Sequence, residues 1–205
     1  MKLIDLTHSF KNNMPAFPGD PQATLTPVAS ITKEGYTDHE LKSYMHVGTH
    51  MDAPLHMIEN GKKMDSLPLD NFFGPGVVLD VRGKQVIDAS VFDTIDVLPG
   101  SIVLLYTGFG KLFQTEAYFN NQPTVNEDFA RRAVDLKVKI VGMDILGPDQ
   151  PPFPTHKILL GNSVLIVENL VNLDQLLSQP NFEIIALPMK LQADAAPVRV
   201  VAVLP

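Results

Sequence analysis

The segment His46-Val47-Gly48-Thr49-His50-Met51-Asp52-Ala53-Pro54-Leu55-His56 holds three of the six histidines of this 205-residue chain. An eleven-residue window of average composition would hold roughly 0.3 of a histidine, so the cluster is not compositional noise. Imidazole and carboxylate groups are the donors that zinc or manganese takes in a catalytic site. The segment therefore predicts a metal site, in preference to a loop of solvated histidines.

The spacing of the segment restricts its backbone. In a straight strand His46 and His50 would lie about 13 Å apart, whereas two ligands of one ion need donor atoms about 3–4 Å apart. Gly48 and Pro54 both disfavour a regular helix. We therefore expect a strand end that curls at Gly48 and Thr49, followed by an extended stretch at Asp52 and Ala53.

The pattern H-x-G-T-H-x-D-x-P-x-H resembles the signature of the metal-dependent cyclase-like hydrolases, the group of bacterial kynurenine formamidase and isatin hydrolase. Weaker similarities occur in the same order along nearly the whole chain. They are Ile4–Thr7, Met14–Pro21 with a P-G-D-P turn, Leu105–Gly108, His156–Leu160 and Glu168–Leu173.

The resemblance implies a β-rich swivelling β/β/α fold and a second ligand pair, His156 and Glu168. With His46, His50 and Asp52 these would bind one or two zinc ions per chain, with manganese as the alternative. The resemblance makes His56 the general acid/base; otherwise it would orient Asp52. The implied activity is arylformamidase-like, the hydrolysis of N-formylkynurenine to kynurenine and formate by metal-activated water.

Two departures from the family pattern concern the substrate pocket. Phe17 stands where the kynurenine formamidase branch has an aromatic residue, often Trp, and is our candidate for stacking on the substrate ring. Ala195 replaces a usual glycine, which raises a question about the local loop.

The residues alone say less about the other histidines. His156 follows a proline-rich loop, where a histidine is often only solvated. Glu168 adjoins an apolar run, and a carboxylate buried there needs a partner such as a metal. We expect a structural role for His8 and a surface position for His39.

Composition excludes several other functions. The formal charge of −7 argues against nucleic acid and anionic membranes as partners. The chain has no cysteine, and it has no apolar run long enough to span a membrane. We expect a single domain over 1–205, a cytoplasmic location, and a homodimer or higher assembly with Phe72, Phe73 and Phe113 as candidate interface or pocket-rim residues.

Alternating apolar runs predict more strand than helix, and hence a mixed α/β architecture with helices flanking β-rich sheets. A capping-box pattern at Thr124–Glu127 predicts a helix to about Leu136, and Leu173–Leu177 predicts a second, short one. The predicted strands are Lys2–Thr7, Ala23–Thr32, Leu41–His46, Gly76–Val81, Ser101–Tyr106, Lys137–Met143, Val164–Val167, Phe182–Leu187 and Val198–Val203.

Three other functions compete with the arylformamidase prediction. The same site would also open another cyclic amide or lactone, such as isatin. A non-catalytic metal-binding protein would close the coordination shell with protein ligands and leave no spare histidine such as His56. A serine hydrolase is disfavoured because the chain lacks a G-x-S-x-G motif.

Overall fold

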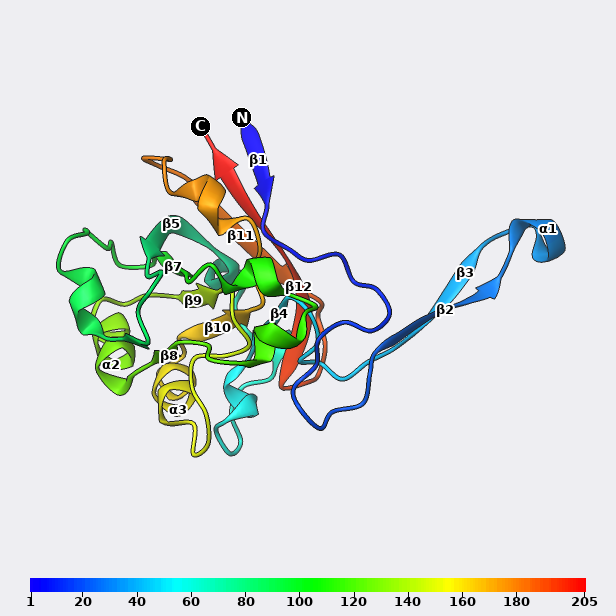
Figure 1. Ribbon diagram of the computed structural model, residues 1–205, viewed down its shortest axis with the longest axis horizontal. Coiled ribbons are helices and arrows are strands. Elements are labelled where there is room, and N and C mark those ends of the chain that lie inside the picture. Colours follow the sequence, from blue (N-terminus) through cyan, green and yellow to red (C-terminus); the bar gives the residue numbers. More distant parts are fainter.

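The computed structural model describes residues 1–205, and its centre is an eight-stranded sheet in the order β1-β12-β11-β5-β7-β9-β10-β4 (Figure 1). Because β12 also pairs with β4, the sheet curves back on itself. The strands of this sheet are β1 Lys2–Asp5, β4 His50–Asp52, β5 Phe73–Asp80, β7 Ile102–Tyr106, β9 Ile140–Met143, β10 Leu165–Glu168, β11 Glu183–Pro188 and β12 Ala195–Leu204.

The middle of the sheet is a parallel block, in which β5, β7, β9 and β10 pair side by side. Every residue of β7, β9 and β10 is buried, as expected for parallel strands covered on both faces. Alternate residues of β7 enter different cores, Ile102 and Leu104 on one face and Val103 and Leu105 on the other. The mixed α/β prediction is confirmed.

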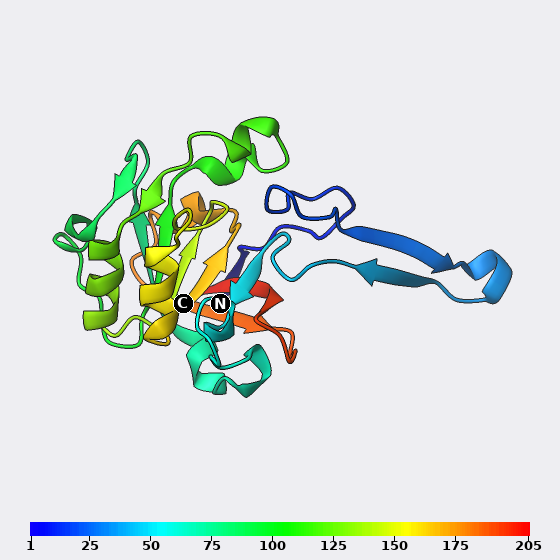
Figure 2. The same cartoon turned by 90° about the horizontal axis from the view of Figure 1, so that it is seen from below.

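Two helices, α2 (Glu127–Asp135) and α3 (Pro154–Gly161), pack against each other beside this block (Figure 2). The predicted helix ends close to the expected place, but the predicted cap at Thr124 is wrong. Thr124 and Val125 form β8, which pairs with β6 (Val86–Ile87), and Asn126 caps the helix by accepting a hydrogen bond from the Phe129 amide. The second predicted helix is a 3-10 turn, Leu173–Leu176.

An arm projects from this body, formed by β2 (Thr24–Ala29), α1 (Ile31–Glu34) and β3 (Asp38–Lys42) (Figures 1 and 2). No residue of the arm is buried. The predicted strand Leu41–His46 is wrong beyond Lys42. The ladder ends at the pair of Thr24 and Lys42 because the preceding residue, Ala23, is already buried in the body.

Two further observations concern surfaces. The prediction that Phe72 lies at an interface or at the pocket rim is wrong. Phe72 is only 4% exposed and packs in the main hydrophobic core. Phe73 is 40% exposed, and Phe113 stacks on His8. No helix of the structure combines the length and apolar character needed to cross a membrane.

Candidate metal centre

The histidine-rich segment bends where glycine allows it. Gly48 has a φ of +67°, in the left-handed region that favours glycine. The chain then runs extended as β4, between β10 and the start of β12, with His50 opposite Glu168 and Asp52 opposite Ala195. The predicted bend and extended stretch are confirmed, although no strand precedes the bend directly.

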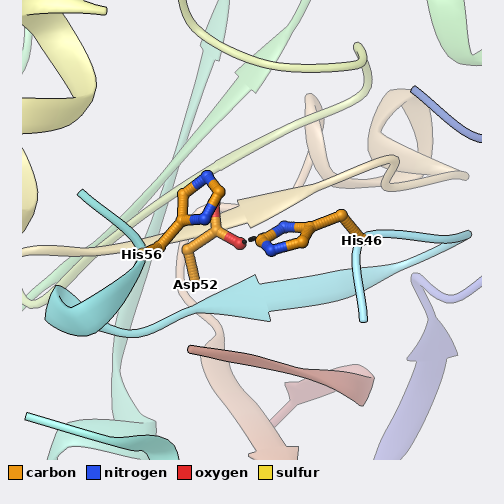
Figure 3. Close-up of side chains that lie close together, drawn as sticks. All are labelled: His46, Asp52 and His56. Atoms are coloured by element: carbon orange, nitrogen blue, oxygen red, sulfur yellow. Dashed lines mark ion pairs between the residues drawn. The ribbon is translucent and has the colours of Figure 1, made fainter. Parts of the chain in front are cut away.

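This path brings the six predicted polar side chains to one place. Figure 3 shows His46 and His56 converging on Asp52 from either end of the segment. His46 Nδ1 lies 3.0 Å from Asp52 Oδ1, and the ring centres of His46 and His56 are 4.1 Å apart. Because residues 47–51 lie between them, a regular strand would have kept His46 and Asp52 far apart.

Glu168, at the end of β10, joins the second half of the site to the first. Its two oxygens lie 3.3 Å from His50 Nε2 and 3.4 Å from His156 Nε2. His156 comes from α3, a helix that the sequence did not predict. Pro154 begins that helix, where its missing N–H costs nothing, and the following turn carries His156 to the site.

In each of the three predicted histidine ligands, one ring nitrogen faces Asp52 or Glu168 and the other ring nitrogen has a hydrogen-bonding partner that holds the ring in place. His50 Nδ1 lies 2.8 Å from the Gly48 carbonyl, His156 Nδ1 pairs with Asp149, and His46 Nε2 lies 2.8 Å from Asp194 Oδ2. A metal-ligating histidine commonly has such a partner, which fixes its tautomer and ring orientation. The sequence analysis assigned neither Asp149 nor Asp194 a role at the site.

Buried polar atoms that lack a good hydrogen bond indicate whether a cation fits this site. His50 Nε2 and both carboxylate oxygens of Asp52 are buried and make no well-directed hydrogen bond, although His46 Nδ1 lies 3.0 Å from Asp52 Oδ1 and Glu168 Oε2 lies 3.3 Å from His50 Nε2. A carboxylate buried without hydrogen bonds is costly, and here a second one, Glu168, lies in the same cluster. Sharing a divalent cation removes that cost. The nitrogen and oxygen donor set therefore fits a metal ion.

The titration of the metal-free site points the same way. Burial lowers the pKa of His46, but the neighbouring Asp52 and Asp194 carboxylates outweigh it and raise the pKa to about 9. Burial is likewise outweighed at His156, where Asp149 and Glu168 raise the pKa to about 10. Burial tends to raise the pKa of Asp52, but the surrounding histidines hold it below its ordinary value. The metal-free site thus holds protons where a cation would bind.

His56 differs from the other three histidines. It belongs to a single turn, Pro54–His56, and burial lowers its pKa below the ordinary value. It makes no side-chain hydrogen bond, and its nearest carboxylate is Asp194, with Oδ2 3.4 Å from His56 Nδ1. One of its nitrogens also lies within 4.8 Å of donors of His46 and Asp52, so distance alone allows it to act as a ligand as well as a base.

A pocket of about 180 Å³ opens onto the site, a volume of the order that holds one aromatic ring. Phe17 lines it, as do Met57, Leu146 and Phe153. No lysine or arginine lines this pocket.

The remaining sequence questions have simple answers. Ala195 is a fully buried residue of β12, opposite Asp52, so the loop expected to need glycine is a regular strand here. His39 is exposed in β3. His8 stacks on Phe113 with ring centres 3.7 Å apart, and burial, helped by Lys11, lowers its pKa to about 4.

Comparison with known proteins agrees with this geometry. A family model described as putative cyclase matches residues 4–150. The kynurenine formamidase of Salinibacter ruber is 32% identical, over 98% of this chain and 97% of that protein.

Two of the solved structures that share the fold are informative here. One, described as a potential metal-dependent hydrolase with cyclase activity, matches with a TM-score of 0.80 and 31% identity, over 98% of this chain and 96% of that one. An isatin hydrolase bound to the product analogue thioisatinate matches with a TM-score of 0.90 and 22% identity, over 100% of this chain and 92% of that one. The chain belongs to the putative cyclase family and is a metal-dependent hydrolase acting on amide C–N bonds.

Proposed function

We propose that this protein is an arylformamidase that hydrolyses N-formylkynurenine to kynurenine and formate. The observation that carries the proposal is the convergence of His46, His50, Asp52, His156 and Glu168 around buried, unpartnered donor atoms, with His56 beside them. The name of the Salinibacter ruber relative supports the substrate class. Phe17 at the pocket wall offers an aromatic face to an aryl ring.

The five ligand residues would hold one or two divalent ions, with zinc as our first choice and manganese as the alternative, because the donors are nitrogen and oxygen without sulfur. A bound ion of this kind lowers the pKa of a water ligand toward about 7 and stabilises negative charge on the carbonyl oxygen. A cytoplasmic location remains a prediction.

His56 is the group we assign to proton transfer. It lies in the pocket, and its lowered pKa keeps it neutral near pH 7, so that it can accept a proton. We propose that it takes a proton from the attacking water and returns it to the amine nitrogen as the C–N bond breaks. The carbon keeps the new oxygen and leaves as formic acid, which gives its remaining proton to solvent and becomes formate, and the aryl amine leaves neutral.

A second candidate substrate class is a neutral amide, including a cyclic amide such as isatin. The pocket walls are apolar at Phe17, Met57, Leu146 and Phe153, and no lysine or arginine lines them. The α-carboxylate of N-formylkynurenine therefore has no fixed cation to pair with inside this pocket.

Turnover of three compounds would decide between these substrates. Zinc- and manganese-loaded protein would be given N-formylkynurenine, the neutral aryl formamide formanilide, and isatin. We expect kcat/KM to be highest for N-formylkynurenine. A higher value for formanilide would move the proposal to neutral aryl formamides, a higher value for isatin to cyclic amides, and no turnover of any of the three would reject it.

We also propose that the protein is a homodimer held partly by the arm. An isolated two-stranded ribbon is marginally stable in water, and exposed apolar side chains mark contact sites. The arm and the segment after it expose Val28, Ile31, Tyr36, Leu41 and Tyr44. Light scattering should give twice the chain mass of 22.5 kDa, and Ile31→Asp combined with Tyr36→Asp should shift it toward the monomer. A wild-type monomer at micromolar concentration would reject the dimer.

A further inference from the structure

Asp194 lies between the predicted metal ligand His46 and the predicted acid/base group His56. It lies directly before β12, and its backbone carbonyl accepts a 2.8 Å hydrogen bond from the Ala53 amide. Its neighbour Ala195 pairs with Asp52. The backbone of Asp194 is therefore fixed beside the segment that carries the metal site.

The carboxylate of Asp194 faces two histidines with the same oxygen. Oδ2 lies 2.8 Å from His46 Nε2 and 3.4 Å from His56 Nδ1. The two rings lie against each other with centres 4.1 Å apart, so a single oxygen reaches both. The second distance is longer than a good hydrogen bond, as is common for catalytic contacts before a substrate binds.

We propose that Asp194 is a positioning residue that aligns both the predicted ligand His46 and the predicted acid/base group His56. By accepting a hydrogen bond from His46 Nε2, it turns the other nitrogen, Nδ1, toward Asp52. By accepting one from His56 Nδ1, it leaves Nε2 of that ring as the proton acceptor. The proposal rests on the proposed function for the role of His56, but the alignment itself does not depend on the substrate.

Asp149 provides a matched comparison within the same site. It also backs a predicted ligand, pairing with His156 Nδ1, but no hydrogen bond or ion pair joins it to His56. Loss of such a partner commonly costs about 10–100-fold in metal affinity or activity. Both Asp149→Ala and Asp194→Ala should therefore weaken metal binding, whereas only Asp194→Ala should also act on His56.

The decisive test is nitrogen-15 NMR of the histidine rings in metal-free protein at pH 8, above the lowered pKa of His56. We expect His56 to carry its proton on Nδ1 in the wild type and in Asp149→Ala, and to lose that preference in Asp194→Ala. Asp194→Asn, which keeps an oxygen acceptor, should retain it in part. The Asp194 side chain is 40% exposed, so these substitutions leave no buried cavity.

Kinetics at saturating metal give the second readout. We expect kcat of Asp194→Ala to stay about 10–100-fold low with KM changed less than threefold, while Asp149→Ala recovers as metal is added. An unchanged His56 tautomer, or full recovery of kcat in Asp194→Ala, would overturn the proposal. Because NMR needs neither metal nor substrate, an inactive wild type would reject the proposed function while leaving this alignment to be judged by its own result.

Discussion

In β4 all three residues are buried and paired on both sides, whereas in β3, which ends at Lys42, all five residues are exposed and paired on one side only. These two strands are separated in the sequence only by Ser43–Thr49. The neighbours of β4 determine where His50 and Asp52 point. The base of the arm is held by two hydrogen bonds between the Asn12 side chain and the Leu25 backbone, whereas the outer part of the arm is exposed and its contacts come from solvent or from another molecule.

The first way to test this contrast is to remove a side chain from the metal centre. His46→Ala should abolish at least one bound ion per chain and lower kcat/KM by about 10⁴-fold or more, because the ion supplies the activated water. Elemental analysis and amide turnover measure the two effects. The control is His39→Ala on the arm, which should keep wild-type metal content and wild-type turnover. Full metal content in His46→Ala would contradict its assignment as a ligand.

A smaller effect is expected at the neighbouring histidine. His56→Ala should keep wild-type metal content while turnover falls by about 10²–10⁴-fold, the range for loss of a general acid/base. The same two measurements apply. Metal loss equal to that of His46→Ala would make His56 a ligand, which its distance to His46 and Asp52 permits.

Much of the site was predictable because it lies in one short segment. The Gly48 bend and the extended stretch at Asp52 follow from spacing and from the freedom of glycine. Asp149 and Asp194 were not predictable, because their role depends on how β12 and α3 pack against the segment. Spacing along the sequence carries no information about such distant contacts.

The same division holds for the fold. Continuous apolar runs such as Ile102–Tyr106 predict buried strands well, because both faces of the strand need apolar residues. The short strand β4 was not predicted, since its polar residues exist for the site rather than for the core. The end of β3 was misplaced because only its partner strand, and not its own sequence, limits the ladder.

The stability of the metal-free protein should depend on pH through the histidines of the metal centre. The pKa of His46 is raised from 6.5 to about 9, so its charged form stabilises the folded state below pH 6.5, and this stabilisation is lost as the pH rises through about 9. We expect the free energy of unfolding to fall by about 1–3 kcal/mol over that window. His156 contributes to the same fall and continues it toward pH 10.

Urea titrations at pH 6.5, 8 and 9.5 measure this effect. His46→Gln should reduce the slope and leave the part that comes from His156, and His39→Ala on the arm should keep the full slope. Saturating metal should reverse the trend on the acid side, since protons compete with the ion for the same nitrogens. A flat profile from pH 6.5 to 9.5 in metal-free protein would contradict the raised pKa of His46.

Substitutions in the arm should have the smallest effect on the free energy of unfolding. Ile31 is 71% exposed and lies at the tip of the arm, in α1, which has no buried residue. At a protein concentration where light scattering shows monomer, Ile31→Ser should change the free energy of unfolding by less than about 0.5 kcal/mol, as for surface substitutions. Phe129→Ala, in the buried face of α2, sets the scale at about 3–5 kcal/mol.

Repeating this stability measurement at high protein concentration tests whether the arm contacts a second copy of the chain. If the arm contacts a second copy, Ile31→Ser should lower the stability of the assembled protein at high concentration while leaving the monomer unchanged, because only the folded dimer gains from association. A loss above about 1.5 kcal/mol in the monomer would mean that Ile31 packs on its own body. That result would remove the difference between the arm and the metal centre, because contacts within one chain would then fix the conformation of both.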